Sequence, residues 1–467
     1  MKKFLILIPL VLLVLWAGLT WIMGSLTQSG FTAAIEELNA NLGAATAVTA
    51  VSEESYSRGF LSSEAVTKIT TGKGAADGNT DIYLKFKAWH GPLMMTSEGM
   101  KLGTEYVLVT LNKDSLPDEI RSIVEEGFKG AEPVKLGLFT GFGGKVAVDA
   151  EIAPFSSSKP GPETIEFGGL TGEFQTDART SFAIGKINIG PLTVEDKKAG
   201  KLLSIAAGES EMNYTNLVMR VTADGTSHID FPEIKVTTDG NSYVLKDLHF
   251  DNVSKENEGK LDMTSRLSIG SFKGPEKGKY AEIFSRANGN LEMEFDAKGM
   301  EIETLKTMAE AQKKMQATQA NDERNSEAAM EAVRNYMIAA TALLQPGYQL
   351  NNHIAFTNKS GKSEIKLGLE YVGEKKLADL VTVRELVEAL KVNLSLQIVK
   401  DLIPPALAEQ IKPAMAMGFI VDKENAYKGD AILGGGELKL NGQPSPVLQN
   451  MSPLLDAPIP WEKIRGK

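Results

Sequence analysis

Few residues in this sequence have the types and spacings that a catalytic or metal centre needs. The chain contains four histidines, His90, His228, His249 and His353, and no two of them lie at ligand spacing on one expected strand or helix. The H-E-x-x-H zinc motif and the G-x-S-x-G nucleophile motif are both absent from the sequence. The sequence therefore predicts no metal-binding residues and no histidine-dependent catalytic site.

Two further chemical motifs match only in part. Ser156 and Lys159 have S-x-x-K spacing, but they lie in the loop-like stretch SSSKPGP rather than at a helix start. The stretch DGNTD, residues 77–81, begins like a calcium loop, but Ile82 stands where such a loop requires glycine. Cysteine is absent, which excludes thiolate ligands, cysteine nucleophiles and disulfides. We therefore expect no cofactor and no enzymatic activity.

The stretch YSRGFLSSEA, residues 56–65, places an arginine and a glycine inside an expected strand. Alternation along a strand would put Tyr56 and Arg58 on one face and Gly59 on the other. One interpretation is an arginine that contacts a ligand. The sequence favours a second interpretation, in which the stretch shapes the first long strand and Gly59 marks a bulge or a close approach of another backbone.

Composition limits the classes of partner. The 467 residues include 60 acidic and 50 basic side chains, so the formal net charge is −10, and the basic residues form no stripe. Such a surface disfavours nucleic acid and broad contact with anionic lipid head groups. We therefore expect no nucleic-acid partner. The chain is long enough for two or three domains, or for one elongated domain, with a substantial core.

The N-terminal sequence is typical of a membrane anchor. Phe4 to Gly24 contains no charged residue, and a helix of that length spans roughly 30 Å, the thickness of a bilayer core. Lys2 and Lys3 precede it and predict a cytoplasmic N-terminus. The alternative is a cleaved signal peptide, but no small-x-small cleavage site follows directly. The sequence thus predicts a transmembrane anchor over residues 1–24, with the bulk of the chain outside the cytoplasm.

Hydrophobic periodicity divides the next part of the chain. Residues 25–45 have apolar positions at helical spacing and predict a membrane-proximal helix that docks on the protein rather than on the bilayer. Residues 46–300 alternate apolar and polar side chains between Asp-Gly turns, which predicts antiparallel strands with one wetted face. One helix is expected there over residues 115–127, with Ser115 as its N-cap and Gly127 at its end.

The C-terminal part mixes helices and strands. Residues 301–345 predict a helical pair, with an apolar stripe of Met330, Val333, Met337 and Leu344. The sequence favours this stripe as a core side, and the alternative is an adaptable binding face. Residues 346–443 predict a mixed β/α part, and residues 444–467 an extended proline-rich tail. The expected fold class is α+β and β-dominated: an N-terminal transmembrane helix, then an elongated, mostly antiparallel sheet with the helical pair and further C-terminal helices packed on it.

Several short motifs, in order along nearly the whole chain, resemble those of the YdgA-like family of bacterial envelope proteins. They are the lysine-led apolar segment; Tyr56, Arg58, Gly59, Ser62 and Ser63 of YSRGFLSS; Gly91 and Pro92 of HGPL; Gly172, Glu173 and Phe174 of GEFQ; and GELKLNGQ at residues 436–443. The resemblance implies a single-pass protein of the bacterial inner (cytoplasmic) membrane with most of its mass in the periplasm. The family has no assigned activity, so the resemblance implies no catalytic residue or cofactor, and we expect the motif residues to be structural.

Two classes of function stay open at this level. The first is an envelope protein that binds lipid or another apolar ligand along a curved sheet, and the anchor followed by a β-rich body is similar in architecture to AsmA-like envelope proteins. The second is a structural scaffold that binds other envelope proteins or forms a homo-oligomer. Hydrolase activity is a distant third, and it would require a pocket in which histidine, serine and carboxylate groups converge.

Overall fold

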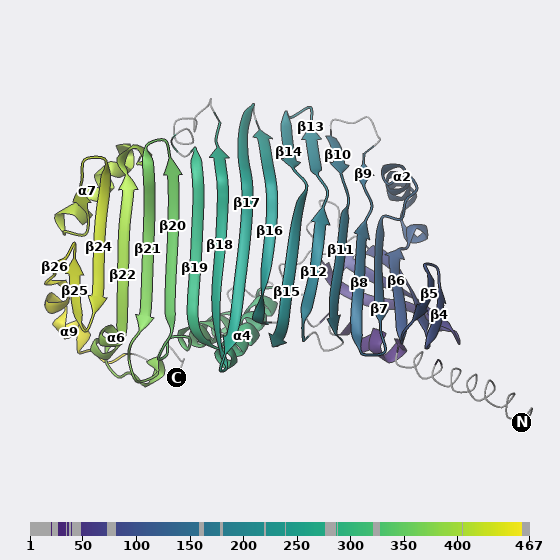
Figure 1. The fold of residues 1–467 in the computed structure, drawn as a ribbon, viewed down its shortest axis with the longest axis horizontal. Coiled ribbons are helices and arrows are strands. Elements are labelled where there is room, and N and C mark those ends of the chain that lie inside the picture. The colour runs from purple at the N-terminus through teal and green to yellow at the C-terminus, as the bar shows by residue number, and fades with distance from the viewer. Residues whose placement is uncertain are drawn as a thin grey trace, which may run out of the picture. The chain divides into compact units, whose positions relative to one another are not determined.

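The computed structural model describes residue 20, residues 27–33, 35, 36 and 39, and then residues 48–71, 81–157, 163–177, 181–218, 221–238, 240–275, 286, 288–320, 327–403 and 405–459. The chain forms two compact units, which we call unit 1 (Met1–Val194) and unit 2 (Glu195–Lys467). Antiparallel strands dominate both units (Figure 1).

The predicted fold class is wrong in one respect, the membrane-spanning helix. Among the residues that the structure describes, no helix combines the length and the apolar character needed to cross a bilayer. The longest of the described helices, α4 (Ile302–Ala320), has 19 residues, but Glu303, Lys306 and Glu310 recur along it, and charged groups are costly in hydrocarbon. Of the segment from Phe4 to Gly24, Thr20 is described, and the rest lies outside the described residues. The described fold is therefore β-dominated, with large antiparallel sheets.

Unit 1 contains a sheet whose strands pair mostly in chain order. Each neighbouring pair in the series β1–β2–β3–β6–β7–β8–β11–β12 is antiparallel. The bounds are β1 (Val48–Arg58), β2 (Ser62–Thr71), β3 (Asp81–His90), β6 (Glu105–Leu111), β7 (Val134–Thr140), β8 (Lys145–Ile152), β11 (Leu170–Asp177) and β12 (Ala183–Ile189). Two shorter antiparallel pairs are β4 (Leu93–Thr96) with β5 (Gly99–Leu102), and β9 (Phe155–Ser156) with β10 (Glu163–Phe167). Strand β13 (Leu192–Asp196) includes the boundary between the units.

Helix α2 (Asp118–Gly127) begins later than the sequence predicts. A 3-10 turn, η1 (Lys113–Ser115), precedes it, and Pro117 occupies the N-cap position. The Ser115 hydroxyl donates to the Asn112 carbonyl at 2.7 Å, so this side chain closes the 3-10 turn and does not cap the helix. Proline suits the first turn, where a backbone N–H would have no helical partner. The predicted end at Gly127 is confirmed.

Unit 2 contains a longer antiparallel series, β15–β16–β17–β18–β19–β20–β21–β22–β24–β25–β26, whose strands stand side by side in Figure 1. The bounds are β15 (Gly208–Val218), β16 (Val221–Thr238), β17 (Asn241–Asn257), β18 (Lys260–Lys273), β19 (Gly289–Glu301), β20 (Gln349–Asn358), β21 (Gly361–Tyr371), β22 (Leu390–Val399), β24 (Ala426–Gly434), β25 (Glu437–Leu440) and β26 (Gln443–Pro444). Strands β14 (Lys201–Ile205) and β23 (Val421–Asp422) pair with β16 and β24.

Helices of unit 2 form the core with one end of the sheet. The predicted helical segment contains α4 and α5 (Glu327–Thr341), and Ile302 and Leu305 of α4 pack with Leu261 and Ala297 of the sheet. The other helices are α6 (Val383–Ala389), α7 (Pro405–Ala416), α8 (Val447–Asn450) and α9 (Ser452–Leu455), with 3-10 turns η2 (Leu377–Asp379) and η3 (Lys400–Leu402). The proline-rich segment is thus partly helical rather than extended, because proline at the first positions of α9 loses no helical hydrogen bond.

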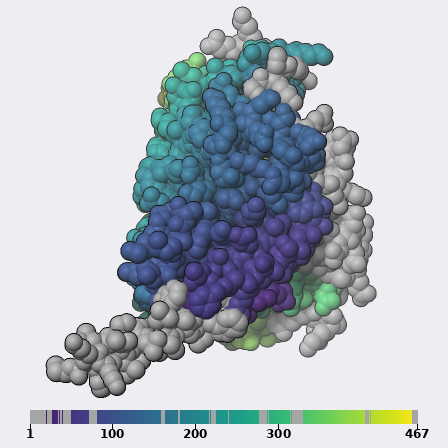
Figure 2. Space-filling view, turned by 90° about the vertical axis from the view of Figure 1, so that its right-hand side faces the viewer, coloured from purple at the N-terminus to yellow at the C-terminus, as the bar shows by residue number. Residues whose placement is uncertain are grey.

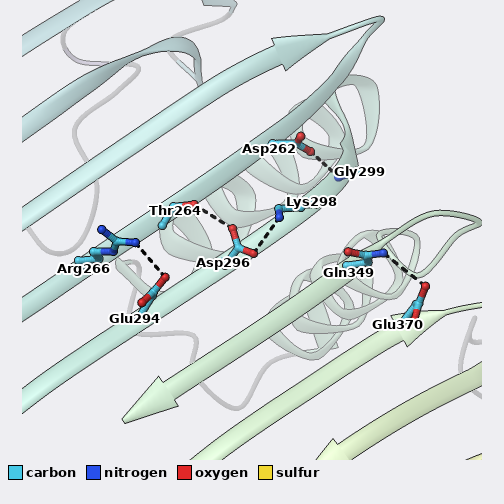
Figure 3. A network of polar contacts seen from close by, with 9 residues as sticks. All are labelled: Asp262, Thr264, Arg266, Glu294, Asp296, Lys298, Gly299, Gln349 and Glu370. Atoms are coloured by element: carbon cyan, nitrogen blue, oxygen red, sulfur yellow. Dashed lines mark hydrogen bonds and ion pairs between the residues drawn. The ribbon is translucent and has the colours of Figure 1, made fainter. Parts of the chain in front are cut away.

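The two faces of the unit 2 sheet differ in chemistry, because neighbouring residues on a strand point to opposite faces. Cross-strand partners on one face form what we call the polar row: His228, Asp251, Arg266, Glu294, His353, Lys366, Ser395 and Asp430. The residues beside them, on the other face, form the apolar row: Ile229, Phe250, Leu267, Met293, Ile354, Ile365 and Leu396. Figure 3 shows polar contacts of this sheet, including Arg266 with Glu294.

Candidate functional site

The stretch YSRGFLSS forms a hairpin rather than a continuous strand. Strand β1 ends at Arg58, β2 begins at Ser62, and Arg58 pairs with Ser63. The Gly59 amide donates to the Ser62 carbonyl at 2.8 Å, and a Cβ on Gly59 would lie 2.8 Å from the same oxygen. The predicted bulge is therefore a turn, whereas the close approach of another backbone at Gly59 is present. Strands β1 to β3 form part of the unit 1 surface coloured purple in Figure 2.

Two motif strands are joined by a buried pair of polar side chains. The Ser63 hydroxyl and His90 Nε2 lie 3.2 Å apart, and both residues are almost completely buried. Burial, together with the positive charge of Arg58, holds the pKa of His90 below its usual range, and the Thr20 backbone opposes this shift in part. His90 is therefore a neutral imidazole at pH 7, which suits a buried hydrogen-bonding group.

The HGPL motif forms a close contact with the N-terminal segment. Gly91 has a φ of 122°, and a Cβ at this position would lie 2.6 Å from the Thr20 hydroxyl oxygen. Thr20 is fully buried. Pro92 accepts a hydrogen bond from the Gly103 amide at 3.3 Å, which closes the loop that carries β4 and β5. Glycine is required here because a side chain would displace the segment that contains Thr20.

A pocket of about 220 Å³ lies between the helical residues 27–33 and the motif strands. Phe31 covers it, with ring centroids 5.7 Å from Tyr56 and 5.2 Å from Phe86. Ser63 and Glu105 are among its lining residues. Burial raises the pKa of Glu105, and a hydrogen bond from the Thr27 side chain lowers it in part. The Tyr56 hydroxyl is buried, and it has no hydrogen-bond partner among the described residues.

This arrangement has the residue types of a hydrolase but not the access. Ser63 bonds to His90, and Glu105 is the cross-strand partner of His90 on β6. A serine–histidine hydrogen bond also occurs in hydrolases, but a nucleophile must reach its substrate, and Ser63 and His90 are only 2 % and 1 % exposed. We therefore assign Ser63 and His90 a positioning role, in which they hold β2 against β3 and fix the hairpin.

The GEFQ residues lie elsewhere in unit 1, on β11. The Phe174 ring covers two glycines, since a Cβ on Gly172 would lie 2.9 Å and one on Gly185 2.4 Å from its ring atoms. Glu173 is exposed on the strand. None of these motif residues is among the residues that line the described pocket. Lys159 and residues 77–80, which belong to the partial S-x-x-K and calcium-loop matches, lie outside the described residues.

The apolar row of unit 2 is open at its centre. Met293, Ile354 and Ile365 are 37 %, 39 % and 40 % exposed, although they are direct partners across three adjacent strands. A second apolar row, made of Phe231, Leu248, Ile269, Leu291 and Phe356, runs beside it on the same face. Contiguous exposed apolar surface marks a ligand or partner site more often than an isolated exposed residue does.

Helix α5 turns its methionines outward. Ala329, Ala332 and Ala339 are buried, whereas Met330 and Met337 are exposed, as is Val333 between them. The prediction that Met330, Val333 and Met337 face the core is therefore wrong. Small alanines allow the helix to pack closely, and the larger side chains lie on another face of the helix. The alternative interpretation, an adaptable apolar surface, fits their position.

The sequence predicted strands with an apolar face that could bind a ligand, but not which residues of that face stay exposed. The signal was present, because each strand alternates apolar and polar residues. Period-2 alternation predicts one apolar face, yet it cannot show which part of that face other elements cover.

The fold and these sites define a class, a β-dominated protein in which a motif hairpin binds an N-terminal helical segment and a sheet has a partly open apolar face. The chain belongs to a bacterial family of unknown function, DUF945, whose family model matches residues 1–447. No curated protein and no solved structure matches the chain.

Proposed function

We propose that the protein is a YdgA-like envelope protein that binds lipid acyl chains along the apolar row of unit 2. The observation that carries the proposal is the exposure of Met293, Ile354 and Ile365 at the centre of that row. An antiparallel sheet with one apolar face normally covers that face. A ligand with a flexible hydrocarbon chain would remove this surface from water without needing a specific polar partner.

The dimensions of the row suit a hydrocarbon chain. It crosses β16 to β22, seven neighbouring strands, and six spacings of about 4.8 Å give roughly 29 Å. That length is close to the hydrocarbon thickness of a bilayer, about 30 Å, which two opposed acyl chains fill. The row is therefore longer than a single extended acyl chain.

Polar side chains border the apolar band on the same face. Asn252 and Ser265 lie two residues from Phe250 and Leu267, and the Ser265 hydroxyl donates to Asn252 Oδ1 at 2.7 Å. Such a border gives the band an apolar centre and a polar edge. This is the arrangement that an amphipathic lipid requires, and a purely structural core would not need the exposed centre.

Lipid analysis of the purified protein tests the proposal. The full chain would be purified from bacterial cells, and bound lipids would be extracted and identified by mass spectrometry. We expect phospholipid or fatty acid with the wild-type chain and much less with a variant in which Met293, Ile354 and Ile365 are all serine. Each residue has about 40 % of its surface available to a ligand. At roughly 1.5–3 kcal/mol for complete burial, the three together contribute about 1.8–3.6 kcal/mol, or roughly 20- to 400-fold in affinity.

The matched control changes exposed apolar residues on another part of the protein. Met95 and Met100 of the β4–β5 pair are direct partners and are exposed, so serine at both positions removes a similar apolar area from unit 1. This control should retain the bound lipid. A wild-type chain that yields no lipid, or a triple variant that retains the wild-type amount, would contradict the proposal.

The second candidate function is binding of another envelope protein, and the exposed stripe of Met330, Val333 and Met337 favours it. Methionine side chains adapt to partner surfaces of different shape. Crosslinking in living cells tests it: products larger than the monomer should form with the wild-type chain and disappear when the three residues are replaced by serine. Recovery of the monomer alone from the wild-type cells would count against it.

The location of the protein remains part of the proposal. Separation of bacterial membrane, periplasmic and cytoplasmic fractions, followed by detection of the chain, tests whether it belongs to the envelope. We propose no catalytic activity.

A further inference from the structure

Unit 2 also contains a cluster of two histidines and two aspartates on the neighbouring strands β16 and β17. The sequence contains H-x-D twice, as His228-Ile229-Asp230 and His249-Phe250-Asp251. Residues two apart on a strand share a face. The antiparallel register then places His228 opposite Asp251 and Asp230 opposite His249. The four side chains form a two-by-two arrangement in which each histidine faces an aspartate.

Each histidine lies within hydrogen-bond distance of the aspartate of the neighbouring strand. His228 Nδ1 lies 2.6 Å from Asp251 Oδ1, and His249 Nδ1 lies 3.0 Å from Asp230 Oδ1. The two rings are nearly parallel, with their centroids 6.4 Å apart. A carboxylate bonded to one imidazole nitrogen directs the other nitrogen outward and increases its basicity, as in carboxylate–histidine–zinc sites.

We propose that His228, His249 and Asp230 bind a Zn²⁺ ion on this face of unit 2, with Asp251 orienting His228. One candidate ligand atom from each of the three residues lies within 4.8 Å of the others. Ligand atoms on a tetrahedral zinc at about 2.0–2.2 Å lie roughly 3.3 Å from one another, so small side-chain rotations close the site.

The ligand set and its surroundings favour zinc over the hard cations. Imidazole nitrogen is a strong zinc ligand, whereas Ca²⁺ and Mg²⁺ prefer oxygen donors alone. The β15 partners of His228 and Asp230 are Glu211 and Glu209, so further negative charge lies on the β15 side of the cluster, whereas the β18 partner of Asp251 is Arg266. All four side chains are partly exposed, which gives an ion direct access and leaves a coordination position for water.

Zinc titration of the full chain by calorimetry tests the proposal. We expect one Zn²⁺ per chain with micromolar or tighter affinity, and no detectable heat with Mg²⁺ or Ca²⁺ at the same concentrations. His228→Gln and His249→Gln should each weaken zinc binding at least tenfold. Asp251→Asn should weaken it roughly 10- to 100-fold, because loss of an orienting carboxylate has that effect in other sites.

His353→Gln is the matched control. His353 also lies on the polar row and also pairs with a carboxylate, Glu364, at 3.2 Å, but the described residues place no second histidine in a candidate metal group with it. This variant should bind zinc like the wild type. Circular dichroism would establish that every variant is folded. Millimolar zinc binding by the wild type, or unchanged binding by the His228 and His249 variants, would overturn the proposal.

Discussion

Replacing Glu98 by glutamine should weaken the packing of the β4–β5 pair on the unit 1 sheet. Glu98 lies between β4 and β5, and its carboxylate accepts a hydrogen bond from the Tyr106 hydroxyl at 2.6 Å. It also forms ion pairs with Lys135 and, at 3.4 Å, with Lys101. The Tyr106 ring stacks on Trp89 with centroids 5.7 Å apart. One carboxylate therefore connects the turn to the aromatic cluster and to β7.

The lowered pKa of Glu98 gives the size of the expected loss in unfolding free energy. The Lys135 and Tyr106 hydrogen bonds lower this pKa from 4.5 to about 2, against the opposing effect of burial. At about 1.4 kcal/mol per pH unit, the shift corresponds to at most about 3.5 kcal/mol of stability at neutral pH. The carboxylate is 28 % exposed, and solvent screening reduces such energies, so we expect about 2 kcal/mol.

The sign of the pH dependence follows from the same shift. Because the folded-state pKa is depressed, the unfolded chain binds the proton first as the pH falls. The contribution of Glu98 is complete above a pH of about 4.5, and it is lost as the pH falls toward about 2. The difference in unfolding free energy between wild type and Glu98→Gln should therefore be constant near neutral pH and decrease in acid.

Urea denaturation, followed by tryptophan fluorescence at neutral and acidic pH, measures this difference. Trp89 is buried in the affected cluster and reports on it. The control is Glu64→Gln, because Glu64 also has a lowered pKa and pairs with Lys87 at 2.8 Å, but it is 57 % exposed. We expect the control to lose about 0–1 kcal/mol. Equal losses in the two variants, or a Glu98 effect that grows in acid, would refute the reasoning.

Two further predictions concern the motif residues. Gly91→Ala should destabilise unit 1 by about 1–2 kcal/mol more than Gly99→Ala in thermal unfolding. Both glycines have φ above 100°, but only a Cβ on Gly91 would contact Thr20. Equal losses in the two variants would show that backbone strain is the whole effect. Ser63→Ala should cost about 1–3 kcal/mol, since it removes the buried partner of His90 Nε2, and a loss below a few tenths of a kcal/mol would remove the positioning role.

The cluster of two histidines and two aspartates shows how far a strand pattern can predict a binding site. In the sequence, Asp239-Gly240 is a strong signal for a two-residue hairpin turn, and the structure pairs Thr238 with Asn241 in the same register that pairs His228 with Asp251. The sequence prediction of no metal site considered one element at a time, and a cluster across two strands lies beyond that test. The H-x-D repeat becomes informative only after the register is known.

The turn of the motif hairpin shows a second limit of prediction from strand patterns. The tyrosine, arginine and serine positions were recognisable, but Gly59 reads as a mid-strand glycine because the residues on both sides alternate correctly for a strand. The structure places the turn there, and it is the turn that brings Ser63 close to His90. Burial of that pair depends on the packing of two different strands, β2 and β3, and a local sequence pattern contains no measure of burial.

By itself, the sequence determined that this is a β-dominated protein, where many of its strands run, and that a helical segment interrupts them. Those properties follow from local alternation, turn residues and helical periodicity, which each short stretch contains. Tertiary structure alone decided that the centre of the apolar row stays exposed, that α5 buries alanines and exposes methionines, and that Thr20 packs on Gly91. These features depend on which distant residues cover a given side chain, and burial is a property of the assembled chain rather than of any segment in it.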